Sequence, residues 1–268
     1  MTKPPQIKLS GITIPQVIFI LFSGIISLVN PAIYGAESAN WRLQSRVQDL
    51  INCTVLVPVL LLSFYLARRG SYRACNIWGG ANIYLVYTYF IYCFDLHFNP
   101  FFLMYCIILG LSFYSTALFF YQQITGGTLP AGSQKRGAKA AGLFFIIISL
   151  LFSIAWIGNI LPAMLHAEPP AEIIDANIPT NPVHVLDLSI FLPGIFLTGV
   201  LLLKADATAT KLAPAISVFI SLMSITIAGL LISRETTILF NAAGAAVLLL
   251  IAVVSCVLFI RLQYFILQ

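Results

Sequence analysis

Nine polar side chains are candidates for a binding site, and they lie next to the apolar segments of the chain. Aspartate, glutamate, histidine, arginine and tyrosine bind cations or polar headgroups through ion pairs and hydrogen bonds. The candidate ligand-binding residues are Asp49, Asp95, Asp187, His97, His184, Glu235, Arg42, Arg46 and Tyr92. They point to a small polar or amphipathic ligand, or a cation.

Two local patterns place histidine beside aspartate: D-x-H at Asp95 and His97, and H-x-x-D at His184 and Asp187. Imidazole and carboxylate are zinc ligands, and a zinc site needs three or four of them to converge. Neither spacing matches H-E-x-x-H, and ordinary surface histidines are the simpler interpretation. These four residues are therefore the metal candidates, and the sequence identifies no cofactor.

The composition places these residues in a membrane protein. The 268 residues are 60% hydrophobic and 9% charged, with a mean hydropathy of +0.97. A soluble domain carries about 25% charged residues, so 14 basic and 9 acidic side chains are too few for a soluble enzyme. The same values exclude a disordered chain and a nucleic-acid-binding domain. The immediate partner of the chain is the lipid bilayer.

Eight stretches are long and apolar enough to cross a membrane as helices, which takes about 20 residues each. The predicted spans are 12–33, 49–67, 76–95, 100–122, 140–162, 184–203, 212–233 and 237–261. Their apolar runs are continuous and lack the alternation of barrel strands. We expect an all-α polytopic protein in which residues 1–268 form a single transmembrane domain.

The basic residues predict how this domain is oriented. With the N-terminus inside, most of the 14 Lys and Arg residues fall in inner loops, and only Arg42, Arg46 and Arg234 lie outside. Because loops rich in Lys and Arg stay in the cytoplasm, both termini are predicted to be cytoplasmic. The expected location is a cell membrane of the bacterial inner-membrane type.

The chain contains a candidate duplication. V-x-D-L occurs at Val47 and at Val185, which places Asp49 and Asp187 138 residues apart (187 minus 49). The same offset relates the starts of spans three and four to those of spans seven and eight. It predicts a parallel 4+4 repeat, with halves 1–122 and 139–268. Spans one and five agree less well and the prolines do not align, so chance similarity of leucine-rich helices is the alternative.

Charged residues and histidines avoid the middle of every predicted span, which argues against a proton pump or a transporter built around a midplane carboxylate. They collect instead at the outer ends of the helices, where Asp49 and Asp187 begin spans and Asp95 ends one. Helix capping is the competing interpretation for Asp49 and Asp187.

Two further features at the outer ends have alternative interpretations. Arg42 and Arg46 either contact the ligand or pair with Asp49 and Glu37. Four tyrosines either line a cavity that leads to Asp95 and His97 or form an interfacial belt with interhelical packing. These tyrosines are Tyr84, Tyr87, Tyr89 and Tyr92.

The sequence thus predicts a membrane protein that binds a small polar or amphipathic ligand near its extracytoplasmic face, as a transporter or a binding subunit. One alternative is an interfacial membrane enzyme, such as a metal-assisted hydrolase that uses the outer His and Asp residues. Another is a non-catalytic assembly partner of a second membrane protein. No nucleic-acid partner is expected.

Overall fold

The computed structural model describes residues 10–126, 137–233 and 238–267, and this part of the chain is helical, without strands. The helices are α1 (Ser10–Val29), α2 (Ala39–Ile51), α3 (Val57–Arg68), α4 (Tyr72–Phe94), α5 (Phe102–Thr125), α6 (Ala138–His166), α7 (Ala171–Ala176), α8 (Pro182–Leu186), α9 (Leu192–Leu203), α10 (Ala207–Ser233) and α11 (Ile238–Leu267). A 3₁₀ turn (Pro31–Tyr34) follows α1.

Seven helical stretches in the described residues are long and apolar enough to cross a membrane. They are α1, α2–α3, α5, α6, α8–α9, α10 and α11. The prediction of an α-helical multi-pass membrane protein is therefore confirmed. The predicted third span is the long helix α4, which is less apolar than the seven because it carries buried asparagines and tyrosines.

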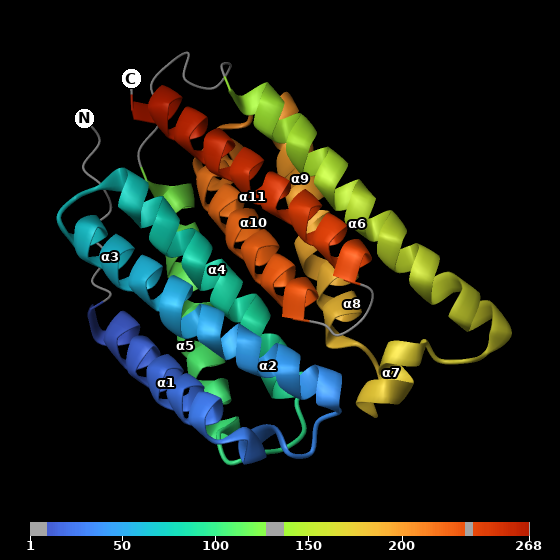
Figure 1. Cartoon of the computed structure of the whole chain (residues 1–268). Coiled ribbons are helices and arrows are strands. Elements are labelled where there is room, and N and C mark those ends of the chain that lie inside the picture. The colour runs from blue at the N-terminus through green and yellow to red at the C-terminus, as the bar shows by residue number, and fades with distance from the viewer. Residues whose placement is uncertain (1–9, 127–136, 234–237, 268) are drawn as a thin grey trace.

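The helices run up and down side by side, with α1–α5 on the left of Figure 1 and α6–α11 on the right. Helices α4 and α10 pack together at the centre. At this crossing, a Cβ atom on Gly80 would lie 2.5 Å from the carbonyl oxygen of Ala215. Only glycine allows the two backbones to approach so closely.

Two of the spans contain a π-helical segment, Asn52–Leu56 between α2 and α3 and Asp187–Phe191 between α8 and α9. In each case a proline follows as the second residue of the next helix, Pro58 or Pro193. Proline cannot donate a backbone hydrogen bond, which fits a local change in the helical hydrogen-bond pattern. The helices that follow, α3 and α9, are both 12 residues long.

These two helices also end in matching turns. Gly70 and Ala205 have positive φ angles of 90° and 57°. Ser71 then caps α4, and Asp206 accepts a hydrogen bond of 2.8 Å from the Ala209 amide at the start of α10. Each pair is separated by 135 residues, as are the two prolines (193 minus 58). The backbone matches therefore occur at an offset of 135, whereas the V-x-D-L motifs suggested 138.

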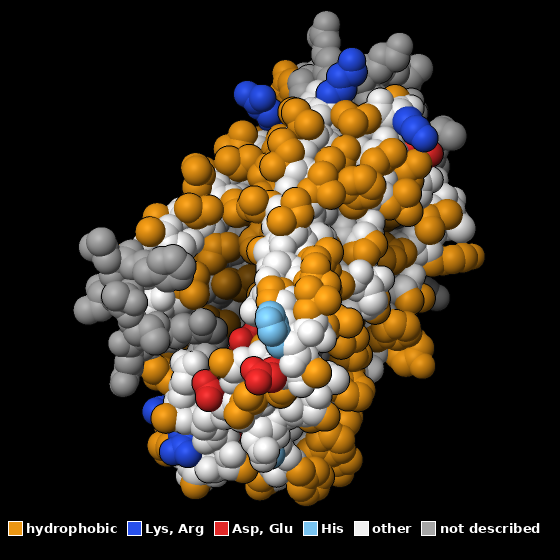
Figure 2. All heavy atoms as spheres, turned by 90° about the vertical axis from the view of Figure 1, so that its right-hand side faces the viewer, with side chains coloured by type: hydrophobic (Ala, Val, Ile, Leu, Met, Phe, Trp, Pro, Cys, Tyr) orange, Lys and Arg blue, Asp and Glu red, His pale blue; other side chains and the backbone are white. Residues whose placement is uncertain are grey.

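The ends of the bundle differ in charge. We call one end basic, because Arg68, Lys139, Lys204 and Arg261 lie there, and the other acidic, with Glu37, Asp95, Glu172 and Asp175. Figure 2 shows most blue side chains at the upper end and others at the lower left, most red ones toward the lower end, and a hydrophobic belt between the two ends. This is the distribution expected of a protein embedded in a bilayer.

Candidate functional site

The carboxyl group of Asp49 is buried and fully hydrogen-bonded within the first half of the chain. Its oxygens accept hydrogen bonds from the hydroxyls of Ser27, Tyr34 (2.6 Å) and Tyr92 (2.8 Å). Asp49 does not cap a helix, because α2 begins ten residues earlier at Ala39 and is capped by Ser38. The capping interpretation was therefore wrong for Asp49, whose three donors come from three different segments.

Asp187 is not a cap either, since α8 begins at Pro182 and Asn181 caps it. The helix continues through Asp187 as the π-helical segment. Capping therefore explains neither aspartate.

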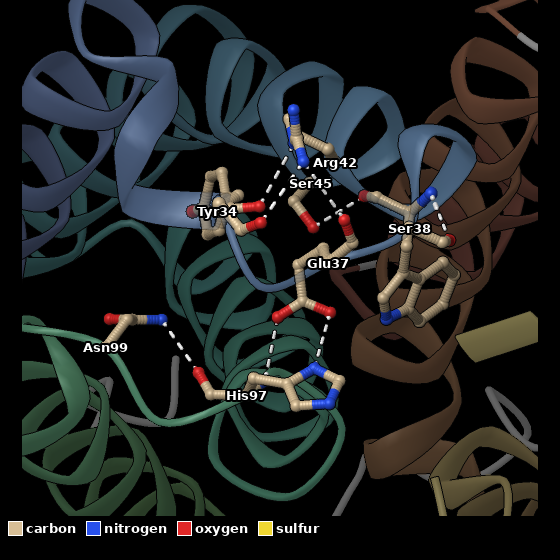
Figure 3. Close-up of polar contacts among 9 residues, drawn as sticks. Tyr34, Glu37, Ser38, Arg42, Ser45, His97 and Asn99 are labelled. Carbon is tan, nitrogen blue, oxygen red and sulfur yellow. Dashed lines mark hydrogen bonds and ion pairs between the residues drawn. The ribbon is translucent and has the colours of Figure 1, made fainter. Parts of the chain in front are cut away.

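Arg42 and Arg46 bind backbone carbonyls, and the structure shows no ion pair between them and Asp49 or Glu37. Arg42 donates to the carbonyl oxygens of Tyr34 (3.1 Å) and Glu37 (3.2 Å), and Arg46 to that of Leu28 (3.0 Å). Cations favour the carbonyl-rich C-terminal end of a helix. Arg46 therefore holds the end of α1, and Arg42 holds the turn that follows it (Figure 3 shows Arg42).

His97 is held by Glu37, as Figure 3 shows. The buried Glu37 carboxylate accepts a hydrogen bond from the His97 backbone amide (2.7 Å). Its other oxygen lies 3.0 Å from the Nδ1 atom of the His97 ring. This pair joins the loop after α4 to the loop before α2. His97 thus has a structural partner at the acidic end.

Asp95 lies beside this pair, in the loop after α4, and is only 2% exposed. Neither of its carboxyl oxygens has a hydrogen-bond partner among the described residues. Burial and the nearby Glu37 carboxylate raise the pKa of Asp95 to about 7, although His97 lowers it. The Asp95 carboxyl group is therefore expected to gain or lose its proton near neutral pH.

Asp187 belongs to a second group of polar residues, in the other half of the chain. Its carboxyl oxygen Oδ2 accepts a hydrogen bond of 2.7 Å from the indole of Trp156 on α6. The Tyr87 hydroxyl on α4 also interacts with this carboxyl group. His184 packs against the Trp156 ring at 4.5 Å, and its buried Nε2 has no partner in the described part of the chain.

Next to Asp187 lies a cavity of about 60 Å³. Its lining is mostly apolar and comes from α4, α6, α9, α10, α11 and the π-helical segment. The lining residues include Tyr87, Asp187, Phe191, Phe219, Met223 and Ser224. Small-molecule sites are usually apolar cavities with a few polar groups, of about 300–1,000 Å³, so this smaller cavity can enclose only part of a ligand.

The candidate residues thus form two groups, and not one ring. Asp49, Tyr92, Asp95, His97, Arg42 and Arg46 belong to the first half, and His184 and Asp187 to the second. Glu235 lies outside the described residues. Among the residues that are described, no group of three or more His, Cys, Asp or Glu side chains is arranged to hold a metal ion.

The tyrosines of α4 contact residues of both groups. Tyr84, Tyr87, Tyr89 and Tyr92 are all buried. Tyr92 reaches Asp49, Tyr87 reaches Asp187, and the Tyr84 hydroxyl accepts from Gln48 Nε2 at 2.7 Å. The interfacial-belt interpretation was wrong for these residues, while interhelical packing is confirmed. They connect polar groups inside the bundle.

Sequence reasoning missed Trp156, Phe191 and Phe219 as members of the second group. The tryptophan inside the predicted span 140–162 was the available signal for Trp156, since tryptophan favours the membrane interface. The two phenylalanines carried no signal that set them apart from other core residues.

Comparisons of the chain with protein-family models, curated proteins and solved structures found no match.

Proposed function

We propose that this protein binds a small amphipathic ligand in the cavity beside Asp187, near the extracytoplasmic face of a bacterial-type inner membrane, as a transporter or a binding subunit. One observation carries the proposal: Asp187 lies in the wall of a mostly apolar cavity. Such a cavity suits a ligand with one polar end and an apolar body.

The orientation that this proposal needs has both termini in the cytoplasm. α1 begins and α11 ends at the basic end of the bundle (Figure 1). Lys and Arg are retained on the cytoplasmic side, so the acidic end faces outward. The helix α4 then serves as the eighth span, because it has 23 residues and lies parallel to its neighbours.

The proposed architecture is a parallel repeat of two four-span halves. It is supported by the paired π-helical segments, prolines, left-handed turns and caps, all at an offset of 135. Gly80 and Ala215 also differ by 135 and face each other where α4 crosses α10. Equivalent residues meet in this way on a pseudo-twofold axis.

The binding role is better supported than the enzymatic alternative. A metal-assisted hydrolase would need converging ligands, and His97 with Asp95 lies in a different group from His184 with Asp187. An assembly role would use an exposed surface of the bundle, and the acidic-end part of α6 exposes apolar side chains such as Ile154 and Leu165 that the bilayer can cover.

Fluorescence quenching tests the binding site directly. The full chain in phosphatidylcholine nanodiscs is titrated with a brominated decyl maltoside, an uncharged amphiphile whose bromine quenches nearby tryptophan. We expect saturable quenching, because Trp156 lies beside the cavity. Ser224→Leu fills the cavity and should abolish the saturable component.

Ile154→Phe is the matched control, because it adds bulk to an exposed position of α6 outside the cavity lining. Its quenching should equal that of the unaltered protein. Non-saturable quenching of the unaltered protein would overturn the proposed function, as would saturable quenching that a folded Ser224→Leu variant retains.

A further inference from the structure

We infer that the ligand is a single-chain amphiphile whose headgroup is an organic ammonium ion. This inference rests on the proposed binding site and specifies its chemistry. Three features of the cavity carry it: the charge of Asp187, the aromatic rings around it, and the aliphatic walls beyond.

The charge argument begins with the partners of Asp187. The carboxyl group interacts with an indole N–H and a phenol hydroxyl, both neutral. Among the described residues the structure shows no Lys or Arg within ion-pair distance of it. A carboxylate removed from water without a cationic partner is destabilised. A ligand with a positive headgroup would supply the missing charge, whereas a phosphate or carboxylate ligand would be repelled.

The aromatic rings of the cavity favour an organic cation over a metal ion. Phe191 lies edge-on to Tyr87, with ring centroids 4.9 Å apart, and stacks on Phe219 at 5.2 Å. All three rings line the same cavity as Asp187. Aromatic faces attract organic ammonium groups through cation–π interactions, and they offer no oxygen ligands to a metal ion. The combination of one carboxylate and several rings therefore favours an alkylated or primary ammonium headgroup.

The remaining walls suit a hydrocarbon chain. Ile195, Leu248 and Ile251 also line the cavity. On this side α6 packs against α9 but scarcely touches α11. Figure 2 shows that the face on the second-half side is hollowed near its acidic side chains. A chain that follows the apolar walls can therefore reach the bilayer between α6 and α11.

Competition with the brominated maltoside tests the headgroup. Three ligands of equal chain length are compared in phosphatidylcholine nanodiscs: decyltrimethylammonium, 1-decanol and decyl sulfate. We expect the ammonium compound to displace the quencher at a concentration at least tenfold lower than either of the others. Asp187→Asn should reduce this preference to less than twofold, because it removes the negative charge while retaining the shape.

Asp175→Asn is the matched control, since it removes one exposed negative charge from the acidic end and lies outside the cavity. It should keep the full preference for the ammonium compound. Equal displacement by all three ligands, or a preference that survives Asp187→Asn, would overturn this inference while the proposed function stands. Absence of saturable binding of any amphiphile would overturn the proposed function itself.

Discussion

The two halves of the molecule share a backbone design but differ in what fills their interior. In the first half, the space beside the π-helical segment holds Tyr89 and Tyr92 of α4. At the positions 135 residues later, α10 carries the smaller Ser224 and Ile227, and a cavity is present. The larger side chains at these two positions fill the interior of the first half, whereas the smaller ones leave the cavity in the second half.

The polar groups differ in the same way. Asp49 has its hydrogen bonds supplied by three hydroxyls of the chain, so it has no need of a ligand. Asp187 is held by Trp156 and Tyr87 at the wall of the cavity. The polar group of the first half therefore contributes stability, and that of the second half lies at the proposed binding site.

The largest loss of stability is expected from disrupting the packing of α4 against α10. In Gly80→Val, the added side chain meets the Ala215 carbonyl at 2.5 Å and the Val218 side chain. Overpacking against a backbone atom should destabilise the protein by about 3 kcal/mol. We expect aggregation on detergent extraction, measured by size-exclusion chromatography.

Gly110→Val is the control for this change, because a Cβ at Gly110 has no atom within 4 Å. It places the same valine in a helix of similar length and should extract as a single symmetric peak. A Gly80→Val protein that is as stable as Gly110→Val would contradict the close contact of α4 and α10.

The next prediction compares the two aspartates. Asp49→Ala removes the buried acceptor that the hydroxyls of Ser27, Tyr34 and Tyr92 share. The Ser27 and Tyr92 hydroxyls keep the backbone carbonyls of Gly24 (2.9 Å) and Ser45 (3.4 Å) as acceptors, so the Tyr34 hydroxyl is the one left unsatisfied among these three. One unsatisfied buried group costs about 1–3 kcal/mol, so the melting temperature should fall by roughly 5–10 °C. Asp187→Ala should change the melting temperature by only a few degrees and remove ammonium selectivity. The reverse pattern would contradict the division between a stabilising and a binding half.

The sequence predicted seven spans that the structure supports, and the site only in part. Apolar runs mark the spans because backbone in lipid must be helical; the predicted third span is the helix α4, which is not among the seven. The offset of 138 from V-x-D-L differs from the 135 that relates the π-helical segments, because V-x-D-L aligns aspartates, whereas Asn52 and Asp187 begin these segments. A π-helical segment has no clear sequence signature.

The separation of the candidate residues into two groups was also beyond sequence reasoning. Their position toward helix ends was predictable from hydropathy, but the side of the bundle that each occupies depends on helix packing. Likewise, Arg42 donates to the backbone carbonyls of Tyr34 and Glu37, whereas an ion pair with the carboxylate of Asp49 or Glu37 was the alternative that the sequence offered. The loop geometry that presents these carbonyls cannot be read from residue types.

A smaller effect is expected from pH in the first half. The pKa of Asp95 is raised to about 7 in the folded protein, above the ordinary value of 3.8. Because the folded state then binds the proton more tightly than the unfolded state, stability falls as the pH rises from about 4 through 7. The melting temperature should decrease over this window, and Asp95→Asn should flatten the decrease. Glu168→Gln, which changes an exposed acid of the outer loop, should leave the profile unaltered.

The smallest effect is expected at Trp156, which links α6 to the proposed site. Trp156→Phe removes the hydrogen bond to Asp187 while keeping an aromatic ring against His184. A hydrogen bond to a charged group contributes about 1.5–3 kcal/mol, but the carboxyl group retains Tyr87, so we expect decyltrimethylammonium to bind only about fivefold more weakly. Displacement of a spin-labelled decyl ammonium probe, followed by electron paramagnetic resonance, measures this without tryptophan fluorescence. Unchanged affinity would show that Trp156 does not position Asp187, whereas complete loss would show that the indole contacts the ligand itself.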